Sequence, residues 1–105
     1  MASRLQVDRY VVDTLMPDLV GHDKQPSAFI VYLYLWSRGT RPAASLQQMA
    51  LDTGLSKSAV QKAIRTLRRR RLLTSRQQSA TSVPEYALAM PWRRPARAKA
   101  PGLRT

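Results

Sequence analysis

The segment from Ser56 to Arg70 carries basic, amide and hydroxyl side chains at helical spacing and contains no acidic residue. A helix turns by about 100° per residue, which divides this segment into two faces. One face holds the apolar side chains Val60, Ala63, Ile64 and Leu67. The opposite face centres on Ser58, Lys62, Arg65 and Arg69, flanked by Lys57, Gln61 and Arg68. Lysine and arginine bind phosphate or guanine, and glutamine suits adenine, so this face has the chemistry of a nucleic-acid-binding surface.

Four consecutive arginines, Arg68 to Arg71, lie at the end of this segment. On the helix they fan out: Arg69 joins the basic face, Arg68 lies at its edge, and Arg70 points away from it. Cations are favoured at the last turn of a helix because the helix dipole is negative there. We therefore expect Arg68 and Arg69, but not Arg70, to contact phosphate.

The net charge of +12 lies entirely in the second half of the 105-residue chain. Residues 1–55 carry equal numbers of basic and acidic residues, whereas residues 56–105 carry thirteen Lys and Arg against one acid, Glu85. This asymmetry predicts a polyanionic partner, and we expect nucleic acid rather than an anionic membrane.

Several kinds of site and segment are excluded or not expected. The absence of cysteine excludes disulfides and thiolate zinc sites. No apolar run approaches the ~18 residues of a membrane span, and the N-terminus has no stretch shaped like a secretory signal, so we expect no membrane partner. His22, the single histidine, has no second metal ligand of comparable quality and no nucleophile beside it. We predict no catalytic residue, no metal site and no cofactor, and hence no enzyme.

Two further helices would position the basic segment. Residues 28–39 are apolar almost all round and follow Pro26 and Ser27, which predicts a central buried helix, with a β-strand as the competing interpretation. Ser45 is a good N-cap for a shorter helix that Gly54 would end. A tight turn over 53–56 then leads into the basic helix.

The remaining segments are a hairpin and two ends. Residues 72–76 and 85–89 have the composition of strands, joined by the polar loop 77–84. Residues 1–26 form an N-terminal segment that is partly helical and interrupted at Pro17, although a short strand is equally compatible with its start. Residues 91–105 are a basic tail with too few apolar groups to fold alone.

The order of these elements resembles a winged helix-turn-helix, a mainly α fold with a small β-hairpin. The stretch "LQQMALDTGLSKSAVQKAIRTL" followed by "LRRRRLLTSR" and "PEYAL" is similar to the DNA-binding domains of MarR- and GntR-type regulators and of phage and plasmid replication proteins. The resemblance covers 27–90. Arg71 stands where such families tend to place Gly, and a left-handed backbone there would cost Arg about 1 kcal/mol more than Gly.

The resemblance implies which side chains meet DNA. The recognition helix, 56–70, would enter the major groove and the hairpin 72–89 would be the wing. The expected DNA contacts are Lys57, Ser58, Gln61, Lys62, Arg65, Arg68, Arg69 and Arg76. Ser45 and Gln47 are weaker candidates for phosphate contacts, since Ser45 is as readily a simple cap. The tail residues Arg93, Arg94, Arg97 and Lys99 would reach a minor groove or add only nonspecific affinity.

The function expected from the sequence is sequence-specific binding of double-stranded DNA by a homodimeric transcriptional regulator. The N-terminal segment would form the dimer contact, with Leu15, Met16 and Leu19. Replication or partition of a plasmid or phage is the first alternative. A protein- or RNA-interaction module that uses the basic face is the second.

Overall fold

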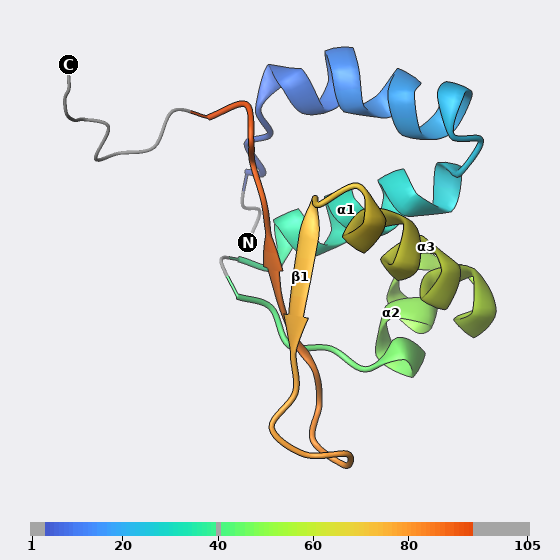
Figure 1. Ribbon diagram of the computed structural model, residues 1–105, viewed down its shortest axis with the longest axis vertical. Coiled ribbons are helices and arrows are strands. Elements are labelled where there is room, and N and C mark those ends of the chain that lie inside the picture. The colour runs from blue at the N-terminus through green and yellow to red at the C-terminus, as the bar shows by residue number, and fades with distance from the viewer. Residues whose placement is uncertain (1–3, 40, 94–105) are drawn as a thin grey trace, which may run out of the picture.

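The computed structural model describes residues 4–39 and 41–93 (Figure 1). Its elements in chain order are η1 Val11–Leu15, η2 Pro17–His22, α1 Pro26–Ser37, α2 Leu46–Thr53, α3 Lys57–Arg69, β1 Leu73–Arg76 and β2 Glu85–Leu88. The fold is mainly helical with one antiparallel hairpin, which confirms the predicted winged helix-turn-helix class. The helical alternative for residues 28–39 is correct, and the strand alternative is wrong.

The helix-turn-helix is built from local signals at the ends of α2 and α3. Ser45 caps α2 by accepting a hydrogen bond from the Gln48 backbone N–H at 3.0 Å. Gly54 ends α2 with φ 83°, a left-handed backbone that Gly adopts without steric cost. Ser56 then caps α3 by accepting from the Ala59 N–H at 3.1 Å. These three residues fix where each helix begins or ends, and therefore how α3 leaves the turn.

The hairpin follows α3 almost at once and is supported by a third segment. β1 pairs with β2 in the register Leu73↔Leu88 to Arg76↔Glu85. Ala43 forms a single bridge with Glu85, and the Tyr86 N–H donates to the Pro42 carbonyl at 2.8 Å. The loop between α1 and α2 therefore lies beside β2, and the hairpin tip extends beyond the body (Figure 1).

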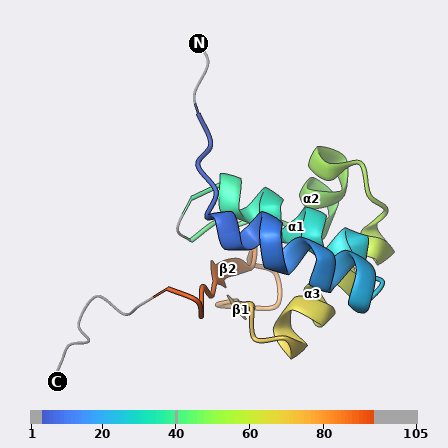
Figure 2. The same cartoon turned by 90° about the horizontal axis from the view of Figure 1, so that it is seen from above.

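The N-terminal segment is helical from residue 9 to residue 22 and lies across α1 (Figure 2). The predicted interruption at Pro17 is wrong, because the chain stays helical through it, and the alternative of a strand at its start is also wrong. Pro17 has no N–H to donate, so a regular α-helical ladder cannot run through it. Bonds to the fifth preceding residue, such as Met16 N–H to the Val11 carbonyl, give π-helical turns on both sides.

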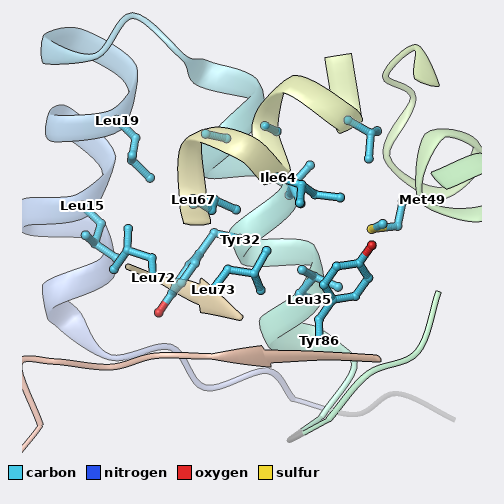
Figure 3. Close-up of a cluster of buried hydrophobic side chains, with 14 of the residues drawn as sticks. Leu15, Leu19, Tyr32, Leu35, Met49, Ile64, Leu67, Leu72, Leu73 and Tyr86 are labelled. Carbon is cyan, nitrogen blue, oxygen red and sulfur yellow. The ribbon is translucent and has the colours of Figure 1, made fainter. Parts of the chain in front are cut away.

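One hydrophobic core joins the N-terminal helix (residues 9–22) to the rest of the fold. Val11, Leu15 and Leu19 are buried, and Figure 3 shows Leu15 and Leu19 reaching toward side chains of the other elements. The largest buried side chain at the centre is Tyr32 of α1, whose hydroxyl donates to the Ala89 carbonyl at 2.9 Å. The core therefore crosses the predicted boundary between residues 26 and 27.

The expected dimer residues need a correction. Leu15 and Leu19 lie inside the protomer, with 4% and 0% of their surface exposed, and only Met16 of the three is exposed. The buried residues of this helix recur every fourth position from Val11. The exposed large hydrophobic residues of this helix are Tyr10, which stacks on Trp92, and the aliphatic residues Val12, Met16 and Val20.

Candidate nucleic-acid interface

Helix α3 separates its side chains into a buried face and a basic exposed face. The buried residues are Val60, Ala63, Ile64, Thr66 and Leu67. The exposed residues include every side chain of α3 that was predicted to meet DNA: Lys57, Ser58, Gln61, Lys62, Arg65, Arg68 and Arg69. Because the apolar stripe is held against α1 and α2, the rotation of α3 about its axis is fixed. The basic face consequently points to solvent along the whole helix.

The cations of this face have no carboxylate partner within the described ranges 4–39 and 41–93. Lys57, Lys62, Arg65 and Arg69 make no ion pair there. When unpaired and exposed cations of a protein bind phosphates, they displace the counterions condensed on the DNA. This release is the main source of electrostatic affinity for DNA. The face is therefore ready to bind a polyanion without first breaking an internal salt bridge.

Asp52 is the only acid within α2 or α3, and its carboxylate is engaged elsewhere. The Tyr34 hydroxyl donates to Asp52 Oδ2 at 2.6 Å, and the Gln48 side-chain amide donates to Oδ1 at 2.9 Å. The Tyr34 hydrogen bond is the main cause that lowers the pKa of Asp52. Burial, followed by the Asp52 carboxylate, raises the pKa of Tyr34. Asp52 thus stays ionised, but it is tied to α1 and α2.

Arg68 turns toward the hairpin. It is exposed, but its guanidinium donates to the Ser75 hydroxyl on β1. Arg76, predicted at the base of the wing, is exposed at the end of β1 and pairs in register with Glu85. Arg41 lies nearby, with its guanidinium 4.0 Å from the Glu85 carboxylate, and was not predicted as a site residue.

The wing loop is polar and internally bonded. The Gln77 side-chain amide donates to the Ser82 carbonyl at 2.7 Å, and the Ser79 N–H donates to the Ser82 hydroxyl at 3.0 Å. No charged residue lies between Gln77 and Pro84. The one basic residue of the hairpin 72–89 is therefore Arg76, at the end of β1 where the loop begins.

Arg71 occupies the position at which α3 turns into the hairpin. Its φ is 59°, in the left-handed region. The Arg71 N–H donates to the Arg68 carbonyl, and the Leu72 N–H donates to the Leu67 carbonyl, both at 2.9 Å. This pair of bonds defines a Schellman motif, in which Gly normally takes the left-handed position. The strain expected at Arg71 is therefore present. The Arg71 side chain is also an exposed cation, which was not predicted as a site residue.

Arg70 is directed away from the basic face and toward the N-terminal helix. It forms ion pairs with Asp18 and with Asp23, the latter at 3.4 Å. The same two acids and His22 bring three metal-ligating groups within 4.8 Å of one another. Asp18, four residues before His22, was not predicted as its neighbour. The Arg70 guanidinium already supplies a positive charge to both carboxylates, which disfavours a metal ion beside it.

The C-terminal end of the described chain is fastened to the start of the N-terminal helix. Asp8 accepts hydrogen bonds from Trp92 Nε1 at 2.8 Å and from Arg93 Nε at 2.6 Å. These bonds, Arg93 first, lower the pKa of Asp8 to about 2. Trp92 stacks on Tyr10 at 4.6 Å between ring centroids.

This arrangement bears on the predicted tail contacts. The guanidinium of Arg93 is held by Asp8, so a DNA contact would have to compete with that pair. The other three, Arg94, Arg97 and Lys99, lie outside the described residues.

Ser45 and Gln47, the weaker candidates, differ in their availability. Ser45 uses its hydroxyl oxygen as the helix cap of α2, which is the simpler of its two predicted roles. Gln47 is exposed at the start of α2.

No helix in the described part of the chain is both long enough and apolar enough to cross a membrane.

Comparisons with known proteins agree with this geometry. The family model described as "Helix-turn-helix domain" matches residues 22–73, about half of the chain. No curated protein and no solved structure matched. The matched segment contains the central helix, the tight turn and the basic helix described above. Residues 22–73 thus match this helix-turn-helix family, which supports a helix-turn-helix DNA-binding domain in this part of the chain.

Proposed function

We propose that the protein binds double-stranded DNA sequence-specifically and regulates transcription, with α3 in the major groove and the hairpin as a wing. The observation that carries this proposal is the exposed face of α3, which is basic, free of acids and unpaired over Lys57, Lys62, Arg65 and Arg69 within the described residues. A catalytic role is not part of this proposal. We also propose that the protein acts at the nucleoid, in the cytoplasm.

Individual roles follow from position along α3. Residues near the N-terminal end of a recognition helix reach base edges, so we assign base contacts to Lys57, Ser58, Gln61 and Lys62. Gln61 suits adenine, while Lys57 and Lys62 suit guanine. Arg65 can serve either base or phosphate. Arg68 and Arg69, at the hairpin end of α3, and Arg76, at the end of β1, would hold phosphate.

We further propose that the protein acts as a homodimer. A single recognition helix offers little specificity, and two helices about 34 Å apart would read two half-sites. Exposed apolar side chains of the N-terminal helix, Val12, Met16 and Val20, replace the buried leucines as the expected contact. A sedimentation experiment at micromolar concentration should show a dimer, with or without DNA. A monomer under both conditions would contradict this part of the proposal.

The experiment that tests the function is selection of bound duplexes from a pool of random and genomic DNA, followed by footprinting. We expect enrichment of one sequence, arranged as a single palindrome near a promoter. Tandem repeats filled cooperatively would instead favour replication or partition. A protein that enriches no duplex sequence but retains structured RNA would favour the interaction-module alternative.

A further inference from the structure

Arg70 connects two parts of the fold that lie far apart in the sequence. It is the last residue before the left-handed turn at Arg71, and its side chain is only 30% exposed. Its guanidinium lies between carboxylates from both ends of η2, Asp18 and Asp23, whose side chains are 33% and 14% exposed. We call these three residues the Arg70 strut. It joins the C-terminal end of the recognition helix to the N-terminal helix.

The strut holds the point where the chain changes direction between the two proposed DNA-contacting elements. Arg70 ends α3, and Leu72 and Leu73, which are buried, begin the path into β1. The Schellman bonds at Arg71 are short-range and do not relate α3 to any other helix. A shift of Arg70 would therefore move the end of α3 and the start of the hairpin together.

Apolar packing alone would fix the junction between α3 and the hairpin less precisely. Leu15, Leu19, Leu67 and Leu72 belong to the same core cluster (Figure 3), but hydrophobic contact is not directional. A planar guanidinium bound by two carboxylates has a preferred geometry, because its N–H donors are fixed in a plane. Two anchors five residues apart, Asp18 in η2 and Asp23 just after it, thus restrict both the position and the rotation of Arg70.

We propose that Arg70 is a positioning residue for DNA recognition, through which the N-terminal helix sets the orientation of α3 and the wing. Most of that helix, residues 9–21, lies outside the segment 22–73 that matches the helix-turn-helix family. With this role for Arg70, the N-terminal helix belongs to the DNA-binding unit, although most of it lies outside the family match. This inference rests on the proposed function, since it assumes that α3 reads the duplex.

Arg70→Gln and its neighbour Arg69→Gln make a matched pair of variants. Each removes one positive charge from the same turn, but Arg69 is exposed and without a carboxylate partner in the described residues. Affinity is measured for the duplex enriched by selection and for a scrambled duplex of equal length, over a range of salt concentrations. The temperature is kept well below the melting transition of each variant.

The expected results differ in kind. Arg69→Gln should reduce the slope of log K against log salt by about 0.9 on both duplexes, because it removes a phosphate contact. Arg70→Gln should leave the slope unchanged and lower the ratio of specific to nonspecific affinity by about tenfold, comparable with the loss of one base contact. Simple destabilisation would lower both affinities alike and leave their ratio unchanged.

The outcomes also separate this inference from the proposal beneath it. The positioning role of Arg70 would be overturned by either of two results for Arg70→Gln: a ratio of specific to nonspecific affinity equal to that of the wild type, or a salt slope reduced as in Arg69→Gln. No slope change in Arg69→Gln would count against the DNA-facing assignment of α3. If Arg70→Gln does not fold, Asp23→Asn is read in its place. It keeps Arg70 and weakens one anchor, so a lower ratio supports the strut and an unchanged ratio refutes it.

Discussion

The left-handed backbone at Arg71 makes a quantitative prediction about stability. An L-residue in this region costs roughly 1–2 kcal/mol, and glycine avoids that cost because it has no Cβ. Part of the gain is offset by the greater freedom of glycine in the unfolded chain. With φ at 59° and the Schellman bonds in place, we expect Arg71→Gly to stabilise the protein by about 1 kcal/mol. For a domain of about 100 residues this should raise Tm by about 4–8 °C.

Arg71→Ala is the matched control for that prediction. It removes the same charge from the arginine run but keeps a Cβ, and therefore keeps the strain. Urea unfolding followed by circular dichroism gives the free energy of unfolding of each variant. The glycine variant should exceed the alanine variant by about 1 kcal/mol. Equal stabilities of the two variants would show that the backbone at Arg71 is not held left-handed in solution.

Two more predictions concern the N-terminal helix. Leu15→Ala should lower the free energy of unfolding by about 2–5 kcal/mol because Leu15 is buried, whereas Met16→Ala should change it by less than about 1 kcal/mol in the monomer; equal effects in chemical denaturation would contradict the observed face of the helix. The pKa of Asp8 is lowered from 3.8 to about 2 by Arg93 and Trp92, so its contribution to stability is present above pH 4 and is lost as the pH falls toward 2. Asp8→Asn should lack this part of the acid dependence in a series of melting curves, and an unchanged pH profile would refute the stabilising role of the Asp8 bonds to Arg93 and Trp92.

Elements with local signals could be predicted from the sequence. Ser45, Gly54 and Ser56 mark the ends of helices by rules that involve only their own turn, and the structure places each as expected. The division of α3 into two faces follows from its periodicity, and the hairpin follows from the composition of its strands and loop. The strain at Arg71 was foreseen because a family pattern supplied a glycine for comparison.

Other features depend on contacts between distant segments, which periodicity does not contain. Arg70 meets Asp18 and Asp23 across about fifty residues of sequence, and Asp8 meets Arg93 across more than eighty. The buried face of the N-terminal helix was misjudged for a different reason. Its π-helical turns bury every fourth residue, Val11, Leu15 and Leu19, while the α-helical period also admitted Met16.

The salt dependence of duplex binding tests the central claim most directly, which is that the exposed face of α3 binds DNA. The slope of log K against log salt is measured for the wild type and for the double variant Lys62→Ala with Arg65→Ala. A second double variant, Arg4→Ala with Arg9→Ala, removes the same charge from exposed positions at the N-terminus. The first variant should reduce the slope by about 1.8 if both groups meet phosphate, and the second should leave it near the wild-type value. Equal slopes in all three proteins would contradict the account.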